Sequence, residues 1–243
     1  MNSLLVSSII GASAGIVGTG LGGMLAFFID NPSKRLLSTL LSFSSGLMIA
    51  VVCFDLLPKS FEIGSFACGI MGIILGIAVI IFCEHLIYRN MESKGKNELL
   101  KTGILLTVGI ALHNLPEGLA IGSGFTAYES YGLGLSIVIA LHDIPEGVAM
   151  ATPLRAGGMD KLKVFMLTLL SGVPTGLGAF IGYLLGGISP MFISICLAFA
   201  GGAMLYITCA ELIPESVELY KGRISSLGLL FGVILGIVIS SMM

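Results

Sequence analysis

Charged residues are scarce in this sequence, and tryptophan is absent. Of its 243 residues, 11% are charged and 56% are hydrophobic, whereas a soluble domain carries about 25% charge. A chain of this size cannot bury so much apolar surface in its own core, so we expect the lipid bilayer to be its solvent. Acidic residues, at 14, outnumber the 12 basic ones, which excludes a nucleic-acid partner because phosphate binding needs a basic surface.

The sequence also lacks any paired cysteine motif. Its five cysteines lie singly within apolar segments, with no CxxC spacing and no disulfide framework. We interpret them as packing residues, because a free cysteine behaves as a small hydrophobic side chain. No Lys or Arg precedes Lys34. A cleaved signal peptide would need a basic start, so we expect the first apolar segment to be retained.

Long apolar stretches dominate what remains. A membrane-spanning helix needs about 20 mostly apolar residues, and the stretches are continuous rather than alternating, which excludes transmembrane strands. The sequence therefore predicts an all-α integral membrane protein with eight transmembrane helices. We expect them at residues 4–28, 36–57, 63–88, 102–125, 131–153, 162–187, 191–213 and 224–242.

The basic residues predict how the chain is oriented. Short cytoplasmic loops collect Lys and Arg, and all basic residues but Lys59 fall in or beside the odd-numbered connections between the expected helices. We therefore expect a multi-pass protein of the cell membrane, plasma or inner, with both termini extracellular or periplasmic. The eleven residues concerned are Lys34, Arg35, Arg89, Lys94, Lys96, Lys101, Arg155, Lys161, Lys163, Lys221 and Arg223.

The chain repeats itself at an offset of 156 residues. Phe43–Glu62 matches Phe199–Glu218 without a gap, and Thr19–Gly23 matches Thr175–Ala179 at the same offset. Five crossings separate each helix from its partner, so the two copies should run in opposite directions. We predict one transporter domain over residues 1–243, with repeats 4–88 and 162–242 inverted around a central pair of helices at 102–153. Inverted repeats are typical of secondary transporters, whose substrate site lies near the midplane.

The central pair of helices carries a doubled polar motif. His113–Gly118 reads HNLPEG and His142–Gly147 reads HDIPEG. Within each copy the polar residues are three or four apart, so their side chains share one side of the helix. Imidazole, carboxylate and carboxamide ligands suit divalent ions such as Zn(II), Fe(II), Mn(II), Co(II) and Cd(II). We predict the metal ligands to be His113, Asn114, Glu117, His142, Asp143 and Glu146.

A buried hydrogen-bond network that only joins the helices is the alternative interpretation of the motif. Such networks in membranes mostly use Ser, Thr or Asn and contribute around 0.6 to 2 kcal/mol. Ionisable groups in the middle of a membrane helix cost about 2.5 kcal/mol or more each. Two Glu, an Asp and two His would be an expensive way to join helices, so the metal site is favoured.

With these two motifs at its centre, the sequence resembles the ZRT/IRT-like protein (ZIP) family of divalent metal transporters, closest to its bacterial GufA-like members. The resemblance covers essentially the whole chain. It implies import of divalent transition-metal ions into the cytoplasm by alternating access, with zinc foremost and iron, manganese, cobalt and cadmium as other candidates. The ion is cargo, no prosthetic group is expected, and the resemblance also implies a homodimer in the lipid bilayer.

The resemblance further implies a binuclear metal site and the motion that exposes it. One ion would be held by His113, Glu117, His142 and Glu146, and the other by Asn114, Glu117, Asp143 and Glu146, with both Glu bridging. An elevator-type or rocking motion would move the helices at 4–28, 102–125, 131–153 and 162–187 against the other four.

Two departures from the family pattern stand out. Thr175 occupies a place where many bacterial members carry a Glu, so one supplementary ligand is missing or replaced and the metal preference is left open. The connection from Arg89 to Lys101 is short and contains no His, so no metal-sensing loop is expected. Met48 could approach the first ion by analogy, although methionine in an apolar helix is more often a packing residue.

The remaining charged residues support weaker hypotheses. Asp55 could attract incoming cations, or it could form an ordinary ion pair with Lys59 four residues later. Its repeat partner Glu211 could form an acidic exit with Glu215 and Glu218, or the three could simply be a solvated helix end.

Two other functions remain open at this point. A metal-selective channel cannot be separated from a carrier by sequence. An intramembrane metalloenzyme is less favoured, because the chain has no HExxH motif and a hydrolase does not need an inverted repeat.

Overall fold

Helices make up the whole fold in the computed structural model, which describes residues 3–28, 33–91 and 98–241. Lys94 and Lys96, which entered the orientation argument, lie outside the described residues. Eight helices are long and apolar enough to cross a membrane, so the predicted multi-pass all-α fold is confirmed. These spans are Ser3–Phe28, Lys34–Ile63, Phe66–Leu86, Leu99–Ala127, Glu129–Ala156, Lys161–Gly186, Pro190–Leu219 and Arg223–Ser240.

The individual elements follow this order along the chain. The α-helices are α1 (Ser3–Phe28), α2 (Lys34–Val51), α3 (Leu57–Ile63), α4 (Phe66–Met91), α5 (Glu98–Ala127), α6 (Glu129–Ala156), α7 (Lys161–Ser171), α8 (Val173–Gly186), α9 (Pro190–Ile207), α10 (Ile213–Leu219) and α11 (Arg223–Ser240). Two π-helical segments, η1 (Val52–Leu56) and η2 (Thr208–Leu212), join α2 to α3 and α9 to α10.

The second and seventh spans run further than the sequence predicted. We expected them to end at residues 57 and 213, before Pro58 and Pro214, but they continue as α3 and α10. The π-helical segments explain the difference: the N–H of Leu57 bonds to the carbonyl of Val52 five residues earlier. Each proline then falls in the first turn of a new helical segment, where its missing N–H is not needed.

The sixth span, in contrast, is interrupted where the sequence predicted one helix. It was expected to be one continuous helix over 162–187, but it is divided at Gly172 into α7 and α8. Pro174, next to this break, has no N–H to donate, and the N–H of Thr175 bonds to the carbonyl of Gly172 at 3.2 Å, a three-residue rather than four-residue step. The carbonyl of Ser171 is instead bonded by a side chain from α5, described below.

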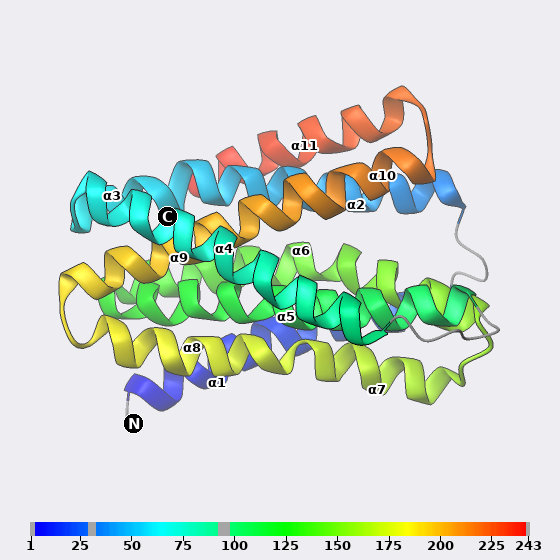
Figure 1. Ribbon diagram of the computed structural model, residues 1–243, viewed down its shortest axis with the longest axis horizontal. Coiled ribbons are helices and arrows are strands. Elements are labelled where there is room, and N and C mark those ends of the chain that lie inside the picture. The colour runs from blue at the N-terminus through cyan, green and yellow to red at the C-terminus, as the bar shows by residue number, and fades with distance from the viewer. Residues whose placement is uncertain (1–2, 29–32, 92–97, 242–243) are drawn as a thin grey trace.

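The helices lie along one axis in two layers (Figure 1). One layer contains α1, α5, α6, α7 and α8, with α1 packed on α6 and α8 packed on α5. The other contains α2, α3, α4, α9, α10 and α11, with α2 packed on α11 and α9 on α4. The layers meet where α2 contacts α6 and α9 contacts α5.

The two π-helical segments follow the 156-residue repeat. Adding 156 to the bounds of α2, η1 and α3 gives the bounds of α9, η2 and α10. Figure 1 shows that α2 and α3 run in the opposite direction to α9 and α10. The two matching segments therefore share both their length and their π-helical irregularity.

Glycines allow the helices of the first layer to approach closely. Gly22 of α1 lies against Gly147 of α6, and Gly178 of α8 lies against Gly118 of α5. Small residues of this kind let backbones come together and favour helix packing in membranes. The central helices α5 and α6 are thus each held by a neighbouring helix at a glycine contact.

A matched pair of glycines on α5 tests this packing. A methyl group at Gly122 would meet the carbonyl of Ala179 and the N–H of Tyr183, whereas a methyl group at Gly109 would meet no atom within 4 Å. We expect Gly122→Ala to destabilise the protein by about 1–3 kcal/mol, as overpacking does. Gly109→Ala should leave stability unchanged or slightly raised, since alanine favours helix. Thermal unfolding in detergent measures both, and equal melting temperatures for the two variants would contradict the close α5–α8 packing.

Candidate metal centre

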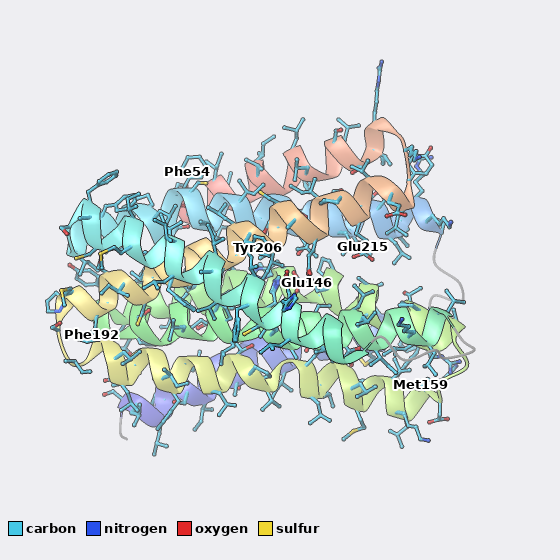
Figure 2. All side chains as sticks on the ribbon, viewed as in Figure 1. Phe54, Glu146, Met159, Phe192, Tyr206 and Glu215 are labelled. Carbon is cyan, nitrogen blue, oxygen red and sulfur yellow. The ribbon has the colours of Figure 1, made fainter. Side chains whose placement is uncertain are left out.

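The two motifs meet in the interior of the helical bundle. His113, Asn114 and Glu117 project from α5, and His142, Asp143 and Glu146 project from α6, with every one of the six at most 1% exposed. Pro116 and Pro145 lie inside these helices without ending them. Glu146 lies near the middle of the bundle's length (Figure 2). The structure therefore places all six predicted ligands in the buried interior of the bundle.

Glu117 is the centre of the contacts between the two motifs. Its Oε1 lies 2.7 Å from Nε2 of His142 on the opposite helix and 3.3 Å from Nε2 of His113 on its own helix. His113 Nε2 is also 3.5 Å from Glu146 Oε1, and His142 Nε2 is 3.5 Å from Asp143 Oδ1. Five of the six side chains thus form one cluster of carboxylates and imidazoles.

Asn114 is attached to this region through the break between α7 and α8. Its Nδ2 donates a hydrogen bond to the carbonyl of Ser171 at 2.7 Å. Because a carbonyl can only accept, the amide must present its nitrogen there, which fixes the direction of Oδ1. That oxygen is buried without a hydrogen-bond partner and is available as a ligand. The break at Gly172 therefore serves to orient a predicted ligand.

Ser44 is a residue of the site that sequence reasoning missed. Its hydroxyl lies 3.2 Å from the carbonyl of His142 and 3.1 Å from Oε1 of Glu146, so it joins α2 to the motif on α6. The repeat pairs Ser44 with Ala200, so repetition did not single it out. The only feature of the sequence that could have indicated Ser44 is its polar side chain on a helix face that is expected to be buried.

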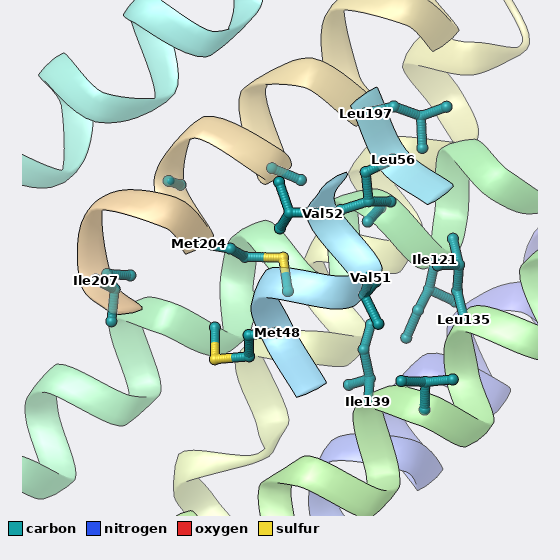
Figure 3. Packing of buried hydrophobic residues seen from close by; sticks show 14 of the residues in the cluster. Met48, Val51, Val52, Leu56, Ile121, Leu135, Ile139, Leu197, Met204 and Ile207 are labelled. Atoms are coloured by element: carbon teal, nitrogen blue, oxygen red, sulfur yellow. The ribbon is translucent and has the colours of Figure 1, made fainter. Parts of the chain in front are cut away.

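Two other residues considered from sequence lie in different surroundings. The sulfur of Met48 lies 3.6 Å from the hydroxyl of Thr208, and its side chain belongs to the apolar cluster of Figure 3. Thr175 is fully buried, and its hydroxyl has no hydrogen-bond partner. A hydroxyl at this position is a weaker ligand than a carboxylate and adds no charge.

Many polar atoms of the cluster have no hydrogen-bond partner. A buried polar or charged atom without a partner costs several kcal/mol, and every one of these atoms belongs to a group that binds divalent metals. Among the described residues, ligand atoms of Glu117, His142 and Asp143 all lie within 4.8 Å of one another. The unpartnered atoms are His113 Nε2, Asn114 Oδ1, Glu117 Oε2, His142 Nδ1, Asp143 Oδ1 and Oδ2, and Glu146 Oε2.

A cavity of about 430 Å³ connects the cluster to one end of the bundle. His113 lines it at the interior, and Glu211, Glu215 and Glu218 of η2 and α10 line it further out. The three acidic residues proposed from sequence as an exit therefore share one cavity with a predicted ligand. A second cavity of about 240 Å³ lies near the other end and is lined by none of the six predicted ligands.

An apolar barrier, which we call the plug, separates the cluster from this second cavity. It consists of buried side chains of α2, η1 and α6, several of which are labelled in Figure 3. Of these two cavities among the described residues, the one that reaches the cluster therefore opens toward the end that holds α10. The plug residues, each at most 1% exposed, are Met48, Val51, Val52, Leu135, Val138 and Ile139.

Adjacent serines on α2 allow the role of Ser44 to be tested. Ser44→Ala removes the hydroxyl that holds Glu146, so we expect divalent-metal affinity to fall about tenfold, as for other groups that orient a metal ligand. Ser45→Ala is the control, because Ser45 bonds to the carbonyl of Leu41 on its own helix. Equilibrium dialysis with Cd(II) measures both. An affinity loss shared equally by the two variants would argue against an orienting role for Ser44.

Comparison with known proteins agrees with this geometry. The model of the ZIP zinc transporter family matches residues 93–241. A zinc transporter ZupT of Stenotrophomonas maltophilia is 30% identical over 234 residues, which cover 88% of this chain and 87% of the relative. The zinc transporter ZupT of Clostridium perfringens is 30% identical over 273 residues, covering 96% and 94%. The chain therefore belongs to the ZIP family, whose members are transporters and not enzymes.

Proposed function

We propose that the protein carries divalent transition-metal ions, zinc foremost, across the cell membrane into the cytoplasm through the buried cluster on α5 and α6. The observation that carries this proposal is the burial of Glu117, Asp143 and Glu146 beside two imidazoles. Three carboxylates without a counter-ion would be strongly unfavourable in this interior, and a divalent cation compensates them. Iron, manganese, cobalt and cadmium are further candidate substrates, because the same ligand set suits them.

We place two ions in the cluster, with both Glu residues bridging. His113, Glu117, His142 and Glu146 hold the first, and Asn114, Glu117, Asp143 and Glu146 hold the second. Two ligands of a tetrahedral zinc ion, each at about 2.0–2.1 Å, lie roughly 3.3 Å apart. The observed separations of 2.7 to 3.5 Å need only small shifts to accept the ion. With Thr175 in place of a carboxylate, we expect the second ion to be held less tightly than the first.

The open cavity faces the cytoplasm in this proposal. Among the described basic residues, Lys59 is in α3, whereas the mouth of the cavity lies at α10 near the opposite end (Figure 1). That end also holds the start of α2, the start of α7 and the connection before α11, which contain Lys34, Arg35, Lys161, Lys163, Lys221 and Arg223. The excess of positive charge at this end supports a cytoplasmic location for it, and we propose that both termini lie outside.

The closed plug favours a carrier over a channel. A channel needs a continuous path, whereas here the path from the cluster toward the outside is filled by buried apolar side chains. We propose that the layer of α1 and α5–α8 moves against the layer of α2–α4 and α9–α11 to expose the ions outward, as an elevator or by rocking. The Ser44–Glu146 contact crosses between these layers and would have to break in such a motion.

The remaining proposals concern the organisation of the chain. We propose a single transporter domain in which residues 4–88 and 162–242 are inverted repeats around the central pair at 102–153. The matching bounds and opposite directions of α2–α3 and α9–α10 support this. Dimerisation in the bilayer and membership of the GufA-like branch remain proposals that rest on the family resemblance.

Metal uptake into proteoliposomes tests the transport function. With a metal-sensitive dye inside, we expect zinc entry to be lost in the double variant Glu117→Ala/Glu146→Ala, because both bridging carboxylates are gone. Entry should persist in Glu129→Ala, a matched change at the first residue of α6, away from the cluster. Size-exclusion chromatography checks that the double variant is folded. Undiminished zinc entry through the folded double variant would refute the proposal.

Thiol labelling tests the one-sided access. In a chain whose five native cysteines are replaced by alanine, Leu106→Cys places a thiol on the wall of the open cavity, and Leu135→Cys places one in the plug. A membrane-impermeant maleimide should label position 106 from the cytoplasmic side in the resting state and position 135 from neither side. Fast labelling of position 135 from outside in the absence of metal would contradict the closed plug.

A further inference from the structure

The second cavity lies beyond the plug and has its own polar residues. It measures about 240 Å³, which is room for an ion together with several water molecules. The residues that line it come from η1, α3, the start of α6 and Tyr128 just before α6. They include Asp55, Lys59, Glu62, Tyr128 and Tyr131.

Asp55 is a buried carboxylate in the wall of this cavity. Its residue is 8% exposed, and its Oδ1 accepts a hydrogen bond from the hydroxyl of Ser240 at 2.8 Å. Its Oδ2 is buried without a hydrogen-bond partner. The sequence left open an ion pair between Asp55 and Lys59, but Lys59 pairs with Glu62 instead, at 2.9 Å. Within the described residues, the carboxylate therefore has no cationic partner to compensate its charge.

Tyr131 contributes a second unpartnered polar group to the same cavity. It is 7% exposed, and its hydroxyl has no hydrogen-bond partner. Buried tyrosine hydroxyls usually find one. The Tyr131 hydroxyl and Asp55 Oδ2 are thus two buried oxygens without a hydrogen-bond partner, on two residues that line the same cavity. Both are oxygens of a kind that a divalent cation with its water shell accepts as partners.

Asp55 and Tyr131 lie where an incoming ion would bind before it reaches the central cluster. Asp55 lies eleven residues after Ser44 along α2 and η1, and Tyr131 lies eleven residues before His142 along α6. Each interval corresponds to about 16 Å along a helix. Because Ser44 and His142 are in contact, Asp55 and Tyr131 lie at a similar distance from the cluster along the bundle axis. The plug residues lie between them and the cluster.

Lys59 already brings a positive charge to the mouth of the cavity. Its Nζ bonds to Glu62 and lies 4.7 Å from the centre of the Tyr128 ring, a distance at which a cation is attracted to the aromatic face. The repeat pairs Asp55, Lys59 and Glu62 with Glu211, Glu215 and Glu218. The outer set therefore contains an ammonium group where the inner set has a third carboxylate.

We propose that Asp55 and Tyr131 form an outer binding site for a divalent cation, and that Lys59 is a tethered cation that competes with the incoming ion. This inference deepens the transport function proposed above, because it names the first stop of the same ion. The site offers only oxygen ligands, so the ion keeps much of its water there. Competition from Lys59 keeps the affinity low, so that a captured ion is not trapped before the plug opens.

Cd(II) binding to a chain with a disabled central cluster tests the outer site directly. The background carries Glu117→Gln, Asp143→Asn and Glu146→Gln in the full-length protein, and equilibrium dialysis gives the ions bound per chain. Adding Asp55→Asn should remove one bound Cd(II), while the amide can still accept the hydrogen bond from Ser240. Tyr131→Phe should weaken that ion severalfold. Lys59→Met should tighten it on the order of tenfold, which corresponds to about 1.4 kcal/mol.

Lys221→Met is the matched control, since it removes one positive charge near the opposite end of the bundle and should leave this affinity unchanged. Unaltered Cd(II) binding after Asp55→Asn would overturn the outer site, and unaltered or weaker binding after Lys59→Met would overturn the competition. Because the assay needs no transport, it separates the two proposals. Binding that depends on Asp55 in a protein whose wild type moves no metal would leave the outer site standing and refute only the transport function.

Discussion

The burial of three carboxylates halfway along a membrane-embedded bundle is the constraint on which the rest of the structure depends. Glu117, Asp143 and Glu146 are fully buried, and an uncompensated charge in such a place costs several kcal/mol. The chain meets this constraint by bringing two imidazoles within 2.7 to 3.5 Å of these groups. Glycine contacts then hold α5 and α6 together with the helices on either side.

The departures from regular α-helix lie close to the polar residues of the interior. The division between α7 and α8 leaves the carbonyl of Ser171 to orient Asn114, and the π-helical segments carry α2 and α9 past their prolines toward the acidic residues at both ends. Non-helical or strained backbone is tolerated at membrane depth only where it is buried in protein or lines a cavity. Each break in this chain meets that condition, which connects the helix geometry to the path that an ion would take.

The two ends of the path differ although the backbone repeats. Equivalent positions place Glu211, Glu215 and Glu218 on a cavity that reaches His113, but Asp55, Lys59 and Glu62 on a cavity that stops at apolar side chains. The difference lies in how the helices of the two layers pack in this conformation, since the plug residues of α2 and α6 are buried in the apolar core. In the transport proposal, the two matching segments would line the two entrances, and packing decides which cavity reaches the cluster.

The sequence by itself determined the membrane setting, the number of membrane spans, the repeat and the positions of the doubled motif. Each of these depends on local composition or on spacing along one helix, which is written in the order of residues. Only the tertiary structure decided that Ser44 holds Glu146, that Asn114 is turned by Ser171, that Lys59 pairs with Glu62 and not with Asp55, and which end is open. These features join residues far apart in the chain or depend on where prolines alter the helical turn. Hydrophobic periodicity does not predict either kind of feature, because both arise only when helices pack against one another.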